Sequence, residues 1–259
     1  MHTTIINDCR DANAAGRQMA RAASLIGGGV SFMGVASDLE AAGNLIDALD
    51  AYGDAPGIVL VNVAPRDGKA KQWKNGTPFG YFWHKEVLVV ASIDGLTLSL
   101  VKKLNVTDIV NVLDIPTIVA RFVHESVLTQ EEGDRISNTQ FRSYEFLPRI
   151  AGDLLKNKEV ISERMNIADV SDASQAVWWT DNFGNCKTTM LLEEISADVP
   201  VQTAFGEVSY FFRLKDVSDG QVALVTGSSG LGASRFLEIV AQGGNAAQLL
   251  DVRSGDVLG

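Results

Sequence analysis

The sequence is poor in the residues that build disulfide frameworks and metal sites. Its 259 residues include two cysteines and three histidines. Two cysteines are too few for a disulfide framework or a four-sulfur metal site, and the histidine spacing matches no helical metal pair. We therefore expect no metal and no cofactor.

Positive charge is also scarce. Lysine and arginine number 22 against 32 acidic residues, which gives a net charge of −10 and a pI near 4.8. A surface this acidic repels phosphate backbones, so we expect no nucleic-acid partner. The net charge does not exclude a small anionic or zwitterionic ligand, because one local pocket can oppose the overall field.

Long apolar runs are absent as well. No window approaches the roughly 18 consecutive apolar residues of a transmembrane helix. The N-terminal sequence MHTTIINDCRD lacks the basic region and apolar run of a secretory signal. We expect a cytoplasmic protein that does not associate with a membrane.

Short apolar runs alternate with helix-length amphipathic stretches in the N-terminal half of the chain. The runs at 57–63 (GIVLVNV) and 87–91 (VLVVA) are continuous, as in strands buried on both faces. Residues 12–25 and 37–51 have the pattern of helices. This alternation predicts an N-terminal α/β domain, residues 1–165, with a largely parallel sheet.

The remaining residues, 166–259, contain short β-rich pieces separated by turn residues. This spacing predicts a smaller C-terminal antiparallel β-barrel. The glycine-rich stretch 222–232 (VALVTGSSGLG) looks like a dinucleotide-binding turn, but too few residues follow it to complete a βαβ unit. We interpret it as a β-turn or loop and do not expect a dinucleotide oxidoreductase.

Two aromatic groups have a structural interpretation. The run 79–83 (FGYFW) could form the wall of a pocket, but we favour an edge strand or an interface, because aromatic side chains at this density usually bury area. Trp178 and Trp179 are adjacent in a predicted strand, so one ring should face inward and the other outward. We expect both to serve packing.

Five separated segments, in order along the chain, resemble segments of one family. DNFGN at 181–185, followed by two threonines, looks like D-x-F-G-N-x-x-T-N, and RFLEI with GNAA near the C-terminus resembles G-Y-L-E-I-A…G-N-A-A. ASIDGL at 91–96, SYEFLP at 143–148 and INDC at 6–9 resemble G-P-D-N-G-L-L, G-R-D-x-F-x-P and the starting T-D-F-G. The ordered set is similar to the S-adenosylmethionine hydrolases (adenosine-forming) and to the related fluorinases and chlorinases.

The resemblance covers nearly the whole chain and implies both an architecture and a reaction. Members of this family have an N-terminal α/β domain and a C-terminal β-barrel, and they assemble as homotrimers. Each site lies between the N-terminal domain of one subunit and the C-terminal domain of its neighbour. The reaction is substitution at the 5′ carbon of the nucleoside with methionine as the leaving group, so the implied partner is a small nucleoside ligand.

Two aspartates are candidate ligand contacts in the N-terminal domain. Asp8 ends the first predicted strand, and the carboxyl ends of strands line the ligand crevice in α/β sheets. A carboxylate there suits a ribose diol; the alternative is a cap for the following helix. Asp94 follows the strand at 87–91 and precedes a glycine, so it is either a ligand contact or part of a β-turn.

The C-terminal candidates also have two interpretations. Asp181 and Asn185 either belong to a turn between strands or bind the cationic amino-acid end of the ligand, with Phe183 stacking on it or shielding it. Asn245 and Ala246 either start a helix or present backbone groups to adenine, where small side chains allow close approach. The resemblance favours the ligand interpretation of both segments.

The sequence departs from the family at the positions that carry the chemistry. Ala64 replaces the family's aspartate, Lys71 stands for its arginine, and Arg142 occupies the place of its histidine. We take Asp67, Lys71 and Arg142 as the candidate catalytic residues. The predicted function is cleavage of S-adenosylmethionine by water to adenosine and methionine. The alternatives are a nucleoside-binding protein without turnover and an enzyme for another adenosyl or nucleoside substrate.

Overall fold

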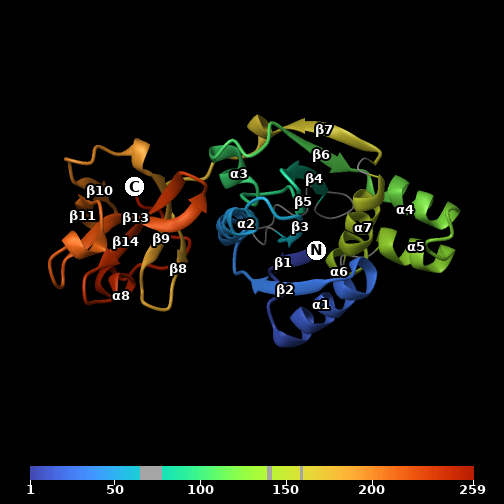
Figure 1. Ribbon diagram of the computed structural model, residues 1–259, viewed down its shortest axis with the longest axis horizontal. Helices are drawn as coiled ribbons and strands as arrows, with labels where there is room; N and C mark the ends of the chain where they lie inside the picture. The colour runs from blue at the N-terminus through green and yellow to red at the C-terminus, as the bar shows by residue number, and fades with distance from the viewer. Residues whose placement is uncertain (65–77, 139–141, 158–159) are drawn as a thin grey trace.

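The computed structural model describes residues 1–64, 78–138, 142–157 and 160–259. Figure 1 shows two parts side by side along the long axis of the molecule. The N-terminal part holds a sheet with helices on both faces, and the C-terminal part holds shorter strands and one small helix. This is a mixed α/β fold with one large sheet and further sheets toward the C-terminus.

The large sheet has seven strands in the order β2-β1-β3-β5-β4-β6-β7. Its strands are β1 (His2–Asn7), β2 (Gly29–Gly34), β3 (Gly57–Asn62), β4 (Phe79–His84), β5 (Val87–Ser92), β6 (Ile109–Leu113) and β7 (Ser162–Asn166). The pairs from β2 to β5 are parallel, and those from β5 to β7 are antiparallel. The sheet is therefore mixed, and the expectation of a largely parallel sheet holds for one half of it.

Helices cover both faces of this sheet because β3 and β5 are apolar on both sides. Val59 and Val61 of β3 pack with α2 in one core cluster, whereas Ile58 and Leu60 pack with α4 and α7 in another. The helices of this part are α1 (Ala12–Ile26), α2 (Asp38–Tyr52), α3 (Ser99–Lys103), α4 (Ile115–His124), α5 (Gln130–Asn138), α6 (Arg142–Glu145) and α7 (Leu147–Asn157).

The aromatic run 79–83 forms β4, an interior strand. Tyr81 pairs with Val90 of β5 on one side and with Asn111 of β6 on the other, and Phe79 and Tyr81 are buried. The prediction of an edge strand was wrong, because the sequence pattern shows that the aromatic residues are buried but not how many strands flank them.

The C-terminal part contains a five-stranded sheet in the order β12-β13-β14-β9-β8 and a two-stranded sheet, β10-β11. Its elements are β8 (Val177–Thr180), β9 (Cys186–Leu191), β10 (Val201–Thr203), β11 (Gly206–Val208), β12 (Tyr210–Phe211), β13 (Val222–Leu231), β14 (Ser234–Ala241) and α8 (Ala246–Leu250). Strand pairing among the described residues does not close these sheets into a barrel. The glycine-rich stretch is β13, which turns directly into antiparallel β14.

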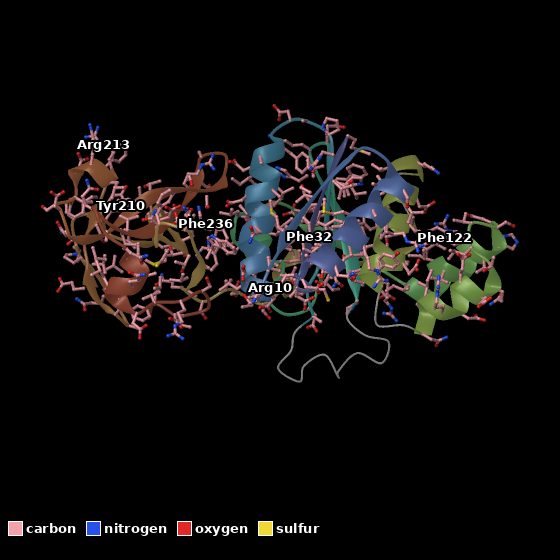
Figure 2. All side chains as sticks on the ribbon, turned by 90° about the horizontal axis from the view of Figure 1, so that it is seen from below. Arg10, Phe32, Phe122, Tyr210, Arg213 and Phe236 are labelled. Carbon is pink, nitrogen blue, oxygen red and sulfur yellow. The ribbon has the colours of Figure 1, made fainter. Side chains whose placement is uncertain are left out.

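Helix α2 joins the two parts through its acidic side chains. The Asp47 carboxylate accepts hydrogen bonds from the Ser229 hydroxyl at 2.8 Å and the Gly230 N–H at 3.1 Å. The Asp50 carboxylate pairs with Arg235 at 2.7 Å. Phe236, beside α2 in Figure 2, is fully buried and belongs to the same core cluster as that helix.

A glycine lets an indole ring reach the same helix. The Trp178 side chain is buried against Gly43 of α2, where a Cβ would overlap the ring. Trp179 is half-buried and packs against the same cluster as Trp178, and β8 has a register shift between Val177 and Trp179, so the simple alternation of the two rings does not hold here. The contact fixes how closely β8 approaches α2.

This contact predicts opposite effects of the same substitution at two helical glycines. Gly43→Ala should lower the free energy of unfolding by about 1–3 kcal/mol, because the new methyl group overpacks the Trp178 site. Gly16→Ala in α1, where nothing lies within 4 Å of the added Cβ, should raise it by up to about 1 kcal/mol. Urea unfolding followed by circular dichroism measures both. Equal effects of the two substitutions would contradict the packing argument.

Candidate functional site

Three parallel strands end together at one edge of the large sheet. The register aligns Asn7 of β1 with Asn62 of β3, and the residues before Asn62 and Ser92 pair in the same way between β3 and β5. Polar residues thus follow apolar strands at their carboxyl ends, where α/β proteins bind ligands. Asp8 comes directly after β1, and Asp94 lies two residues after the end of β5, so both N-terminal candidates lie at this edge.

Asp8 is half-buried and contacts the end of β3. Its N–H donates to the carbonyl of Asn62 at 3.2 Å, and its carboxylate accepts the N–H of Ala64 at 3.3 Å. Asp8 does not cap the following helix, because the carboxylate that accepts the first N–H groups of α1 is that of Asp11. The helix-cap alternative for Asp8 was therefore wrong.

The turn that carries Asp8 is fixed by a buried amide. The Asn7 side chain donates to Gln18 of α1 at 2.8 Å and accepts the N–H of Cys9 at 2.8 Å. On β5 the Ser92 hydroxyl accepts the N–H of Val63 at 3.1 Å. Neither Asn7 nor Ser92 was predicted to have this role, although each is a polar residue at the end of an apolar run.

Asp94 is buried and part of a turn. Its carboxylate accepts the N–H of Gly95 at 2.9 Å, and its carbonyl accepts the Thr97 hydroxyl at 3.3 Å. Asp38 at the start of α2 holds the same turn by accepting the N–H of Leu96 at 2.8 Å. The turn interpretation of Asp94 is thus correct, and the turn also brings this carboxylate to the carboxyl edge of the sheet.

The turn between β8 and β9 is organised by Asp181. The Asp181 carboxylate accepts the N–H groups of Phe183 and Asn185 at 2.8 and 2.9 Å and the side-chain amide of Asn185 at 3.0 Å. Burial alone would raise the pKa of Asp181, but the hydrogen bonds from Asn185 and Phe183 outweigh it and lower that pKa. The Phe183 ring is 70% exposed at the tip of the turn.

This turn contacts the start of α8. The N–H of Ala247 donates to the carbonyl of Gly184 at 2.9 Å, and a Cβ on Gly184 would overlap the Asn245 amide. Asn245 is the N-cap of α8 and accepts the N–H of Gln248 at 2.8 Å, while the Ala246 side chain is fully buried. Two segments far apart in the sequence therefore form one cluster, in which Ala246 can offer only backbone groups.

Of the candidate catalytic residues, Asp67 and Lys71 lie outside the described residues. Arg142, at the start of α6, is 6% exposed, and its terminal nitrogen donates to the Ser137 carbonyl at 3.4 Å. Its Nε is buried and has no hydrogen-bond partner among the described residues. Burial lowers the pKa of Arg142. A guanidinium nonetheless keeps its proton in proteins, so Arg142 cannot act as a general base.

The two candidate clusters belong to different parts of the molecule. Asp8 and Asp94 lie in the N-terminal part, and the Asp181–Asn245 cluster lies in the C-terminal part with α8 (Figure 1). The hydrogen bonds given above for Asp8 and Asp94 join residues of the N-terminal part, and those of the other cluster join residues of the C-terminal part. Each is thus a separate half of the predicted site.

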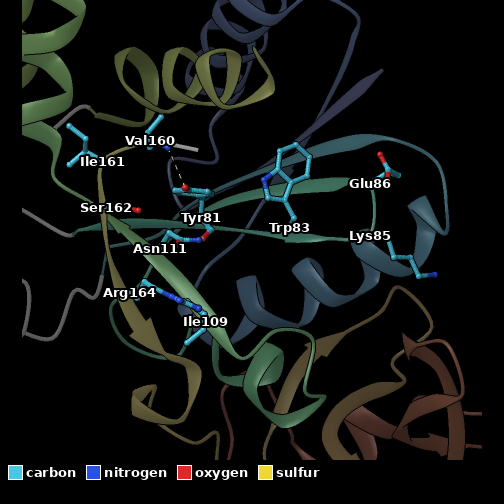
Figure 3. A pocket seen from close by; sticks show the side chains of 10 residues that line it. All are labelled: Tyr81, Trp83, Lys85, Glu86, Ile109, Asn111, Val160, Ile161, Ser162 and Arg164. Atoms are coloured by element: carbon cyan, nitrogen blue, oxygen red, sulfur yellow. Dashed lines mark hydrogen bonds between the residues drawn. The ribbon is translucent and has the colours of Figure 1, made fainter. Parts of the chain in front are cut away.

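A cleft of about 860 Å³ lies elsewhere, on the antiparallel half of the large sheet. Figure 3 shows Tyr81 and Trp83 of β4, Asn111 of β6 and Arg164 of β7 around it. The N–H of Val160 donates to the Tyr81 hydroxyl at 3.5 Å. None of the predicted site residues lines this cleft, but Tyr81 and Trp83 of the aromatic run 79–83 do.

Metal sites and membrane-spanning helices can also be considered for the described residues. No group of three or more histidine, cysteine, aspartate or glutamate side chains among them could hold a metal ion. None of the helices that they form has the length and apolar character of a membrane span.

Comparison with known proteins shows the fold and does not name a family. No protein-family model and no curated protein match the sequence. The fold is similar to the crystal structure of an uncharacterized conserved protein from Thermotoga maritima, with a TM-score of 0.67, 16% identity and coverage of 99% of this chain and 98% of that one. A conserved hypothetical protein from Thermus thermophilus has a TM-score of 0.56 and 20% identity, over 98% of this chain and 96% of that one.

The hydrogen bonds of Asp181 predict a pH-dependent contribution to stability. A lowered pKa means that this contribution is present above the ordinary aspartate pKa of about 3.9 and is lost as pH falls through the lowered value. Asp181→Asn should reduce the free energy of unfolding at pH 7 by about 1 kcal/mol or less, because the turn is partly exposed. The difference from the unsubstituted protein should shrink at pH 3 in urea titrations. Asp198→Asn, at an exposed position, should have no effect at either pH.

Proposed function

We propose that this protein binds S-adenosylmethionine and cleaves it by substitution at the 5′ carbon, with water as the nucleophile and adenosine and methionine as products. The observation that carries the proposal is the contact between the Gly184 turn and the start of α8. The resemblance implies that these two segments bind one ligand. They lie about 60 residues apart in the sequence, so their contact depends on the fold.

The carboxyl edge of the large sheet supports the ribose half of the site. Asp8 presents a carboxylate there on a turn that Asn7 holds in place. A carboxylate accepts two charge-assisted hydrogen bonds from a vicinal diol, and these are stronger than bonds between neutral groups. We assign the ribose to Asp8 and a further contact at the same edge to Asp94.

The C-terminal cluster supports the other two groups of the ligand. Asp181 and Asn185 supply the polar groups for a methionine ammonium and carboxylate, and the exposed Phe183 ring supplies an aromatic wall beside the sulfonium. Asn245 and the backbone of Ala246 contact adenine in this assignment. The exposure of Phe183 is consistent with a surface that a ligand or a second subunit covers.

The separation of the two clusters favours a site shared between subunits. Because each half lies on a different part of the chain, one ligand would join the N-terminal part of one copy to the C-terminal part of the next. The resemblance implies that this assembly is a homotrimer, with the C-terminal sheets corresponding to the barrel of the resembling family.

The leaving group limits the chemistry that the protein has to supply. A sulfonium departs as a neutral thioether, so no general acid is needed. The protein has to exclude bulk water and align one nucleophile in line with the bond to sulfur. Arg142 contributes a fixed positive charge at most, and a base for the water would come from the segment that carries Asp67.

Binding without turnover is the second candidate. It is favoured by Ala64 and Arg142, which stand where the family has an acid and a histidine. Neither of these side chains can accept a proton from water. A protein with an intact binding half and no base would hold S-adenosylmethionine or adenosine as a ligand.

Substitution of Asp8 tests the ribose assignment. Asp8→Asn should weaken binding of adenosine and of S-adenosylmethionine at least tenfold, because it replaces charge-assisted hydrogen bonds with neutral ones. Calorimetric titration measures the affinity, and chromatography of the same sample detects adenosine and methionine. Asp54→Asn, an exposed acid that pairs with Lys85, is the matched control and should bind like the unsubstituted protein.

The products then decide between the two candidates. Adenosine and methionine in the sample would support the enzyme, whereas tight binding with intact ligand would support the binding protein. Unchanged affinity in Asp8→Asn would refute the ribose site, and no binding by the unsubstituted protein would refute both candidates.

A site shared between subunits predicts complementation between two defective chains. Asp8→Asn leaves the C-terminal cluster intact, and Asn185→Ala leaves the carboxyl edge intact. Random co-assembly in equal amounts should restore about one quarter of the sites, because cyclic interfaces combine parts of neighbouring copies. Binding by the co-expressed mixture, compared with each variant purified alone, measures this recovery. A mixture as inactive as its components would place both halves in one chain.

A further inference from the structure

A second cleft, of about 560 Å³, lies between α1 and α6 and is rich in arginine. Arg17 and Arg21 of α1 and Arg135 of α5 line it, together with Tyr144 and Glu145 of α6. In a chain with a net charge of −10, three guanidinium groups around one cleft are a marked local excess. The proposed function uses none of these residues.

The two arginines of α1 share one aromatic ring. The guanidinium carbons of Arg17 and Arg21 lie 5.0 and 4.7 Å from the centre of the Tyr144 ring. They are four residues apart on α1, a spacing at which like charges destabilise a helix. The aromatic face offsets part of this repulsion and holds both side chains at the cleft.

One carboxylate, that of Glu145, forms ion pairs with three of the arginines around this cleft. Glu145 accepts from Arg21 at 3.2 Å, from Arg135 at 3.3 Å and from Arg149 at 2.6 Å. The Glu132 carboxylate accepts hydrogen bonds from Thr129 and also interacts electrostatically with Arg135 and Arg149. With Arg17 included, the four guanidinium groups exceed these two carboxylates by two positive charges.

Several donors at this cleft have no acceptor in the part of the chain that the structure describes. There, Arg17 makes no hydrogen bond or ion pair and contacts the Tyr144 ring. Arg21 donates from a single terminal nitrogen, and its buried Nε has no partner among the same residues. Helix packing accounts for the bonds from Arg21 and Arg149 to Glu145. It does not account for Arg17 or for the remaining charge.

We propose that this cleft binds a phosphate group. Planar guanidinium groups match phosphate oxygens with paired hydrogen bonds, and two unbalanced positive charges match a phosphate dianion. Cys9 also lines the cleft and directly follows Asp8, the proposed ribose contact. The Cα atoms of these two residues are therefore about 3.8 Å apart. The phosphate is either free inorganic phosphate or part of a nucleotide, and only the nucleotide source rests on the proposed function.

Titration with inorganic phosphate tests the site. The full-length protein is titrated calorimetrically at constant ionic strength, with sodium chloride as the balancing salt, because exposed arginines are screened by salt. Arg17→Gln removes the positive charge and keeps a polar, although shorter, side chain, and it breaks no hydrogen bond within the described structure. It should weaken phosphate binding about tenfold or more. Arg213→Gln, on an exposed arginine paired with Asp216, is the matched control and should bind phosphate normally.

Adenosine 5′-phosphate and adenosine separate the two sources. Tighter binding of adenosine 5′-phosphate than of phosphate, weakened by both Arg17→Gln and Asp8→Asn, would support a nucleotide. Binding of phosphate that Asp8→Asn leaves unchanged, with no gain from the nucleoside, would support a free anion even if S-adenosylmethionine does not bind. No phosphate binding, or equal binding by Arg17→Gln, would overturn the proposal.

Discussion

The burial of β3 and β5 on both faces is the constraint on which the rest of the structure depends. Alternate residues of each strand pack against helices on opposite sides, so neither face of the sheet's centre can hold a ligand. Polar side chains are available for binding only where the parallel strands end. Asn7, Asp8, Ser92 and Asp94 gather there because the strands stop in register. The same apolar runs that build the core thus determine where binding groups are available.

The sequence predicted the elements that depend on local pattern. The apolar runs correspond to β3 and β5, and the helix predicted at 12–25 is α1. It was wrong on the interior position of β4 and did not show the antiparallel half of the sheet, because both depend on partners distant in the chain. The closure of the C-terminal strands into a barrel stays a prediction. Likewise, the capping role of Asp11 depends on where β1 ends and α1 begins, a boundary that residue pattern fixes poorly.

The sequence predicted the local parts of the candidate site but not the contacts between them, for a related reason. The pattern around Asp181 predicts a turn by itself, and that interpretation is correct in detail. Its contact with α8 was implied only by the resemblance, because no periodicity connects the two segments. No pattern in the sequence predicted the arginine cleft. Arg17 and Arg135 lie on different helices, and composition records only that the chain as a whole is acidic.

The joint between α2 and β13 has a consequence for how the two parts of the molecule respond to acid. Burial raises the pKa of Asp47, despite its hydrogen bonds to Ser229 and Gly230, so its contribution to stability grows as pH falls. Burial also disfavours the charged form of Asp50, but its bonds to Arg235 and Gly232 prevail and lower its pKa, so its contribution weakens in acid. One helix therefore carries, at a single joint, two carboxylates whose contributions to stability change in opposite directions as pH falls.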